Sequence, residues 1–365
     1  MESDEGYIYK SPSVVWPQKG LLLYGSGTVL YVFDYKESKL SKKLQYSEPN
    51  QFVRSIYIDE DSVVVGFDNK VFTVYDSSFN VLLTRKFNKK ISFIALSEGN
   101  VIICDFFGDV SILKLDLDSI KSSKNRNIDS KLAEEKNIKA SEDTTRNKLT
   151  SGSGDVIVPF SHYSTITSSL IYNDLLFTGN KDGKIFVNSL SNLHEIKNIY
   201  LSHKMSISCL DVREDLNLLL SLSIDDTIRF WNIKTGLEVY RIIIENMKCL
   251  SYYFKTRRNL IILLCLDEIL VINFSFIKLQ LLGYQVYKLP FTAQMCTFLE
   301  DTLFIIDDYS SLYKIDSING VGTDCKVTGN KIAIPVNSTV LENVVCIYKG
   351  DNKCNKINIK KNVNV

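Results

Sequence analysis

Residues that mark several other fold classes are scarce in this sequence. Its 365 residues include 6 prolines, 17 glycines and 3 histidines, and none of the 8 cysteines belongs to a CxxC pair. The scattered cysteines argue against a zinc site and a disulfide framework, so we expect a reducing compartment, the cytosol or nucleus. The three histidines offer no catalytic triad.

The chain also lacks an excess of charge of either sign. It has 43 basic and 42 acidic residues, for a formal net charge of +1. Nucleic-acid-binding domains usually carry a basic surplus, because phosphate contacts dominate their affinity. A direct RNA-binding protein or enzyme would therefore need a local basic patch.

Long apolar runs are missing as well. No window of about 20 apolar residues is present, so we expect no membrane segment. The acidic first twelve residues, MESDEGYIYKSP, have no apolar core, so we expect no signal peptide.

Catalytic motifs are equally absent. No GxGxxG sequence follows a strand pattern, and no serine or cysteine lies in a recognisable nucleophile motif. We therefore expect a non-catalytic protein with no cofactor of its own.

What the sequence does contain is a repeated strand pattern. Each unit is an apolar strand, a turn with Asp or Gly, and a second strand, and a further strand-like segment lies between most units. The spacing is roughly 40 residues, which is typical of four-stranded propeller blades. The units are 21–35, 62–77, 100–115, 174–190, 217–233, 259–274 and 301–316.

Seven units predict an all-β fold, a seven-bladed β-propeller over residues 1–317. An N-terminal strand, YIYK or SVVW, is expected to complete the last blade and close the ring. The polar residues 116–155 are expected to form a disordered insertion between the third and fourth blades. Residues 318–365 are expected to contain further strands, such as IAIPV and VVCIYK, and a polar tail.

The fifth unit, SLSIDDTIRFWN, predicts a chain of hydrogen bonds within one blade. His203 is expected to bond to Asp225 in the turn and to Ser221 on a strand, and Ser221 to reach the indole of Trp231. Buried polar groups need hydrogen-bond partners, and these four residues can provide them for one another, so we assign all four a structural role.

The fourth unit carries a partial version of the same pattern. His162, Thr178 and Asp182 take the corresponding positions, and Asn188 stands where the tryptophan would be. The other five units keep the strands and the turn without the polar residues.

The order of these motifs resembles one family. The segments ICDFFGDVSIL, SHYSTITSSLIYNDLLFTGNKDGKIFVN, YLSHKMSISCLDV and LLLSLSIDDTIRFWN follow one another over about 100–233. They are similar to the WD-repeat non-catalytic subunit of the eukaryotic tRNA (guanine-7) methyltransferase, which also lacks a tryptophan in the fourth unit. The remaining units match that family in architecture only.

The resemblance implies a partner and no active site in this chain. In this family the propeller binds and stabilises a methyltransferase subunit that holds S-adenosylmethionine and methylates a guanine in the tRNA variable loop. The tRNA is bound mainly through the complex, in the nucleus or also the cytoplasm. In an earlier blade motif, Asp105, Gly108 and Asp109 match the family, while Phe106 replaces a lysine.

The same resemblance implies a docking motif in the fourth unit. Lys181 stands in the place of an arginine, Asp182 is retained, Lys184 falls at a variable place and Phe186 replaces a second basic residue. Two alternatives remain open. Asp182 can be an ordinary turn residue with Lys181 and Lys184 solvated beside it, and the chain can be a general WD-repeat scaffold in another intracellular complex.

Overall fold

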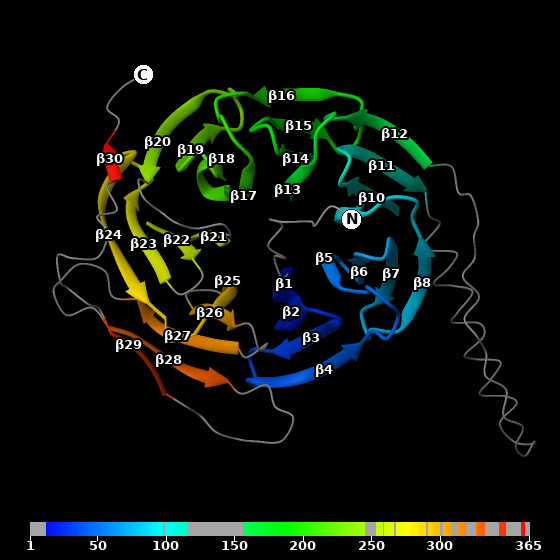
Figure 1. Ribbon diagram of the computed structural model, residues 1–365, viewed down its shortest axis with the longest axis horizontal. Helices are drawn as coiled ribbons and strands as arrows, with labels where there is room; N and C mark the ends of the chain where they lie inside the picture. The colour runs from blue at the N-terminus through cyan, green and yellow to red at the C-terminus, as the bar shows by residue number, and fades with distance from the viewer. Residues whose placement is uncertain are drawn as a thin grey trace, which may run out of the picture.

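Seven antiparallel sheets form a closed ring in the computed structural model of the protein (Figure 1). The structure describes residues 12–97, 99–114, 156–244, 253–257, 259–265, 268–289, 291–299, 302–307, 312–318, 326–332, 343–347 and 359–361. Its two described helical turns are short 3-10 turns, Pro17–Lys19 and Glu214–Leu216. The predicted seven-bladed, all-β propeller is confirmed.

The first four blades follow one another along the chain, each as one four-stranded sheet. Blade 1 consists of β1 (Ser13–Trp16), β2 (Leu21–Ser26), β3 (Val29–Asp34) and β4 (Lys39–Gln45). Blade 2 consists of β5 (Val53–Asp59), β6 (Ser62–Phe67), β7 (Val71–Asp76) and β8 (Val81–Lys86). Blade 3 consists of β9 (Ile91–Ser97), β10 (Asn100–Asp105), β11 (Asp109–Lys114) and β12 (Val156–Ser161). Blade 4 consists of β13 (Ile166–Tyr172), β14 (Leu175–Asn180), β15 (Ile185–Ser189) and β16 (Ile196–Tyr200).

The last three blades include two sheets of five strands. Blade 5 consists of β17 (Ile207–Arg213), β18 (Leu218–Ser223), β19 (Thr227–Asn232), β20 (Glu238–Ile244) and β30 (Ile359–Lys361). Blade 6 consists of β21 (Tyr253–Arg257), β22 (Leu260–Cys265), β23 (Glu268–Ser275) and β24 (Gln280–Lys288). Blade 7 consists of β25 (Ala293–Leu299), β26 (Thr302–Asp307), β27 (Leu312–Ile318), β28 (Lys326–Ile332) and β29 (Asn343–Ile347).

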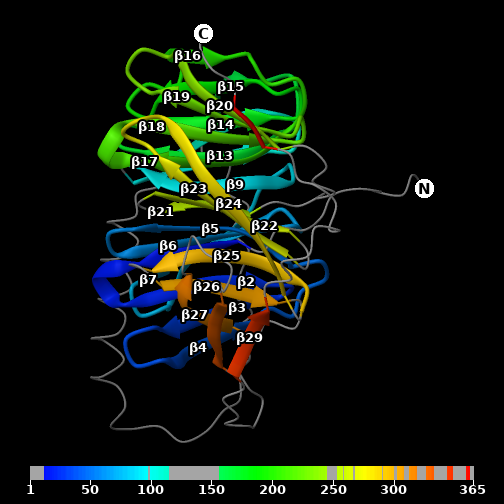
Figure 2. The same cartoon turned by 90° about the vertical axis from the view of Figure 1, so that its left-hand side faces the viewer.

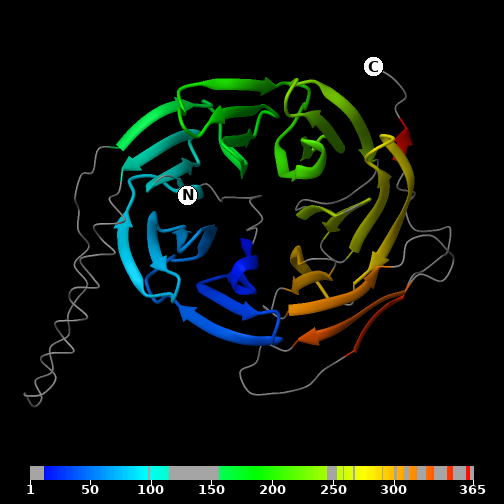
Figure 3. The same ribbon diagram turned by 180° about the vertical axis from the view of Figure 1, so that it is seen from behind.

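The core lies between neighbouring blades, whose sheets stack around the ring (Figures 2 and 3). Successive residues of a strand point to opposite faces of its sheet, so each inner strand serves two clusters. On β6, Val63 and Val65 pack toward blade 1, whereas Val64 packs toward blade 3. This double burial explains why the second strand of each blade is a continuous apolar run without alternation.

The prediction that an N-terminal strand completes the last blade is wrong for SVVW. These residues form β1, which pairs with β2 as the innermost strand of the first blade. The connection is only Pro17–Lys19 and Gly20, with Gly20 in the left-handed region at φ 70°, so β1 can reach no other blade. YIYK (7–10) lies outside the described residues.

The ring closes through side-chain packing. Leu22 and Tyr24 of blade 1 share an apolar cluster with Met295 and Phe304 of blade 7. Blade 7 takes its fourth strand, β28, from residues beyond the predicted propeller boundary at 317. The late strands β29 and β30 then lie at the outer edges of blades 7 and 5.

The position predicted for the insertion also needs correction. Residues 116–155 lie outside the described residues, but the strands on either side, β11 and β12, pair with each other in blade 3. The segment therefore interrupts the third blade and does not separate the third blade from the fourth. β12 is the outermost strand of blade 3 and pairs with a neighbour on one side only. A long connection before it costs little stability, because the entropic cost of closing a loop rises slowly with its length.

Candidate functional site

The fifth blade contains a continuous chain of buried hydrogen bonds. Trp231 Nε1 donates to Ser221 Oγ at 2.8 Å, and Ser221 Oγ lies 2.7 Å from His203 Nε2. On the other side of the imidazole ring, Nδ1 of His203 lies 3.0 Å from Asp225 Oδ2. All four residues that the sequence assigned to this network are thus brought together.

The donors in this chain determine the state of the histidine. The Asp225 carboxylate can only accept, so Nδ1 carries the proton of the neutral ring and donates to it. Nε2 then accepts from the Ser221 hydroxyl, whose oxygen accepts from the Trp231 indole N–H. Burial lowers the pKa of His203, partly opposed by its bond to Asp225, which favours this neutral form.

Asp225 anchors the turn of the fifth blade. Burial alone would raise the pKa of its carboxyl group, but donors from His203, Thr227 and the Lys204 backbone outweigh it and hold the pKa below its usual range. The carboxylate therefore stays ionised and fixes the turn to the preceding linker. The side chains of this network form their hydrogen bonds within the blade and make it rigid, and they present no reactive atom to a ligand.

The fourth blade has only part of this network. His162 Nε2 lies 2.6 Å from Thr178 Oγ1, but Nδ1 is buried and has no hydrogen-bond partner among the described residues. Asp182, in the position of Asp225, is exposed and does not supply that partner. Burial and the charge of Lys184 lower the pKa of His162 to about 4.

Asn188 replaces the tryptophan and is completely buried. Its Nδ2 donates to the Leu193 carbonyl at 2.9 Å, so it joins β15 to the following turn. Phe186, two residues earlier, is half-buried and lies edge-on to His162 with the ring centroids 4.3 Å apart. Phe186 therefore covers the incomplete network, and only part of its ring is available to a partner.

The turn between β14 and β15 exposes the remaining predicted docking residues. Asn180 Oδ1 accepts from the backbone N–H groups of Asp182 and Lys184, at 3.0 and 2.9 Å. With the backbone held in this way, the side chains of Lys181, Asp182 and Lys184 are exposed. The turn is a rigid platform for these three charges.

Turns and linkers of successive blades meet at one end of the propeller, which we call the turn face. It consists of the turns between the second and third strands of the blades and the linkers that enter the next blade. The linker 162–165 joins two blades there, since His162 N donates to Gly108 O at 2.9 Å and Lys181 N donates to Thr165 O at 2.9 Å.

Apolar side chains are exposed across the turn face of blades 3 to 5. Phe107 is 68% exposed, Tyr163 95%, Met205 50% and Ile224 40%. We call these four residues the apolar strip. Backbone contacts connect its parts: a Cβ on Gly108 would meet Ser164 O at 2.3 Å, and Ile224 N donates to Ser206 O at 3.0 Å.

The apolar strip runs past the predicted docking residues. A Cβ on Gly183 would meet Met205 O at 2.8 Å, which places the Lys181–Lys184 turn against the strip. Lys204 is exposed beside it. Sequence reasoning missed the strip, although its members share one signal, an apolar residue in a turn or linker position where solvent exposure is expected.

The third-blade turn is tied down by ion pairs. Lys89 Nζ contacts the carboxylate of Asp109 and lies 3.3 Å from Asp105 Oδ2. Asp105 Oδ1 accepts from Phe107 N at 2.7 Å, and Gly108 adopts φ 98°. Cζ of the Arg54 guanidinium group lies 5.3 Å from the ring centroid of Phe106, the residue that follows Asp105.

The described residues contain neither a cluster of metal ligands nor a membrane-spanning helix. No group of three His, Cys, Asp or Glu side chains there is arranged to hold a metal ion. No helix among them is long and apolar enough to cross a membrane.

Comparison with known proteins identifies the fold and no family. No known family and no curated protein matches the sequence. Among solved structures, the computationally designed protein Ika8 has a TM-score of 0.55 and 14% identity, covering 85% of this chain and 97% of that one.

A chain of a natural complex and a natural propeller domain give similar values. A chain of the Mitotic Checkpoint Complex has a TM-score of 0.60 and 14% identity, covering 84% of this chain and 86% of its own. The Cps50 (Swd1) β-propeller domain of Myceliophteria thermophila has a TM-score of 0.58 and 10% identity, covering 83% and 95%. The chain therefore has the fold of a seven-bladed β-propeller, and at 10–14% identity these similarities show the fold alone.

Proposed function

We propose that this protein is a non-catalytic propeller subunit that docks a partner protein on the turn face of blades 3 to 5. The observation that carries the proposal is the apolar strip beside Lys181, Lys184 and Lys204. Exposed apolar side chains interspersed with charged ones on one face of a soluble protein are typical of interaction surfaces. The partner surface would therefore be apolar with acidic residues at its rim.

For the partner we propose the catalytic subunit of a tRNA (guanine-7) methyltransferase. This identity rests on the order of motifs over 100–233 and on the place of Lys181, Asp182 and Lys184 within them. The propeller would stabilise and position that subunit, which would hold S-adenosylmethionine and bind most of the tRNA. The complex would act in the nucleus or also the cytoplasm.

The test starts with the two purified proteins. The chain and the methyltransferase subunit of the same cell should elute as one complex, and depletion of the chain should lower 7-methylguanosine in tRNA. Lys181→Glu with Lys184→Glu should weaken the complex by about tenfold or more, because charges at an interface rim steer and select the partner. Lys36→Glu with Lys234→Glu, on turns between third and fourth strands, is the matched control.

Three results would count against the proposal. They are an unchanged tRNA 7-methylguanosine level, no complex between the two purified proteins, and equal binding by both double variants. A complex with a different protein through the same turn would instead favour the general WD-repeat scaffold, which the fold alone also supports.

A further inference from the structure

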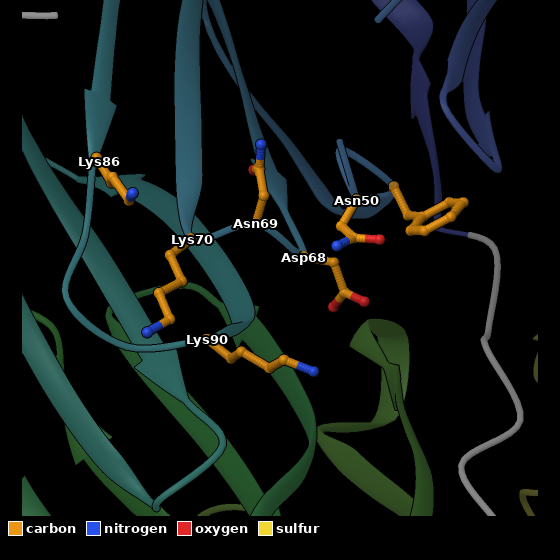
Figure 4. Close-up of a pocket in the computed structure, with 7 residues that line it drawn as sticks. Asn50, Asp68, Asn69, Lys70, Lys86 and Lys90 are labelled. Carbon is orange, nitrogen blue, oxygen red and sulfur yellow. The ribbon is translucent and has the colours of Figure 1, made fainter. Parts of the chain in front are cut away.

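A second feature of the turn face is a basic hollow over blade 2 (Figure 4). It has a volume of about 380 Å³, within the size range of ligand sites. Figure 4 shows Lys70, Lys86 and Lys90 on one side and Asn50 and Asp68 across from them. The lining residues are Asn50, Phe52, Asp68, Asn69, Lys70, Lys86 and Lys90.

The three lysines leave the basic hollow with an excess of positive charge. None of the ion pairs among the described residues involves Lys70, Lys86 or Lys90. The single carboxylate in the lining, Asp68, is already neutralised, because Arg54 Nη2 lies 2.6 Å from its Oδ1. Three ammonium groups around one concavity produce a local positive potential that attracts an anionic ligand.

The walls of the hollow are fixed by backbone hydrogen bonds from three segments. Asp68 N donates to Phe52 O at 3.0 Å, and Phe87 N donates to Lys70 O at 2.7 Å. Lys70 and Asn50 both adopt left-handed backbone conformations, with φ of 68° and 55°. The concavity is therefore part of the folded propeller and does not depend on chance side-chain positions.

The chemistry of the lining favours carboxylates over phosphates. Arginine offers the planar fork that matches phosphate, but the lining contains no arginine, and Arg54 is committed to Asp68. Lysine ammonium groups act as separate point charges, which suits carboxylates spaced along a chain. The Asn50 and Asn69 amides can bond a peptide backbone, and Phe52, 38% exposed, offers an apolar contact.

We propose that the basic hollow binds an extended acidic segment of a partner protein, with its carboxylates on Lys70, Lys86 and Lys90 and an apolar side chain on Phe52. RNA is disfavoured, because the hollow presents one aromatic ring and the chain has no basic surplus. The site adjoins the apolar strip at Lys90, whose carbonyl accepts from Phe106 N at 3.1 Å, but it shares no residue with the strip. The two sites are tested with different ligands and different variants, so failure of this proposal and failure of the proposed function can be told apart.

The test measures binding of a fluorescein-labelled peptide of alternating glutamate and alanine with one central leucine. The full chain should bind it at least about tenfold more tightly than the same peptide with glutamine in place of glutamate, and less tightly as salt rises. Lys70→Ala with Lys86→Ala and Lys90→Ala should lower the affinity about tenfold or more. Phe52→Ala should weaken binding of this peptide and not of one lacking leucine.

The matched control removes the same charge elsewhere. Lys36, Lys234 and Lys278 are exposed on turns between the third and fourth strands of blades 1, 5 and 6, so their triple alanine variant should bind like the unmodified chain. Thermal unfolding should show that both triple variants are folded. Equal binding of the glutamine peptide, unchanged affinity of the Lys70/Lys86/Lys90 variant, or tighter binding of an oligouridylate RNA through these lysines would overturn the proposal.

Discussion

Trp231 and Ser221 lie on adjacent strands of the fifth blade, and the indole N–H of Trp231 donates to Ser221 Oγ at 2.8 Å. The same oxygen lies 2.7 Å from His203 Nε2. One hydroxyl therefore joins β18, β19 and the linker that enters the blade. Nε1 of Trp231 and Nε2 of His203 both have this atom as their hydrogen-bond partner.

Ser221→Ala should destabilise the protein by about 1–3 kcal/mol, because it leaves the indole N–H of Trp231 and Nε2 of His203 buried without a partner. Urea unfolding followed by tryptophan fluorescence measures the change. Ser41→Ala, on the exposed face of β4, is the matched control and should stay within about 0.5 kcal/mol of the unmodified chain. Equal effects of the two changes would show that the network adds nothing to stability.

Acidification from pH 7 to pH 5 should lower the free energy of unfolding. Burial and Lys184 depress the pKa of His162 to about 4, so the unfolded chain, with a pKa near 6.5, binds more protons in this window. The contribution of His162 to the free energy of unfolding is thus fully present above pH 7. It decreases as the pH falls, by about 2 kcal/mol at pH 5. Denaturant unfolding at several pH values measures this slope.

His162→Gln separates this group from the other titrating residues. The variant should show a shallower loss of stability between pH 7 and pH 5, because only His203 then contributes a depressed histidine pKa. Parallel slopes for the variant and the unmodified chain would contradict the assignment.

Gly183→Ala should be among the most disruptive single changes in the fourth blade. Gly183 has φ 81°, and an added Cβ would lie 2.7 Å from His203 O and 2.8 Å from Met205 O. The left-handed conformation alone costs roughly 1–2 kcal/mol, and the backbone contacts add to it. Gly27 has φ 56°, and a Cβ added there would meet no atom within 4 Å, so Gly27→Ala measures the conformational cost alone. The melting temperature should fall further for Gly183→Ala than for Gly27→Ala, and equal losses would exclude the steric contribution.

Tyr163→Gly should separate binding from stability. Tyr163 is 95% exposed and has φ 56°, a conformation that glycine adopts without strain. Its removal should change the free energy of unfolding by less than about 1 kcal/mol, because relieved strain offsets the added chain entropy. Binding of the proposed methyltransferase subunit, measured by calorimetry, should nevertheless weaken. Unchanged affinity would remove Tyr163 from the docking surface.

The sequence by itself determined the number of blades and the inner strands of each. Strand–turn–strand units such as 62–77 are local, so their apolar runs and turn residues carry the information for pairing. The polar chain from His203 to Trp231 was predictable for the same reason, since its members lie within one blade. The equivalent position of Asp182 was predictable too, but its separation from His162 depends on the turn conformation.

Only the tertiary structure decided how the ring closes and which surfaces remain exposed. SVVW pairs within blade 1 because its connection to β2 is short, and blade 1 then meets blade 7 through packed side chains. The apolar strip combines residues from three blades and their linkers, and the basic hollow combines blade 2 with the linkers on either side of it. The periodicity within one unit does not record such neighbours, because the tertiary structure of the ring brings these turns and linkers together.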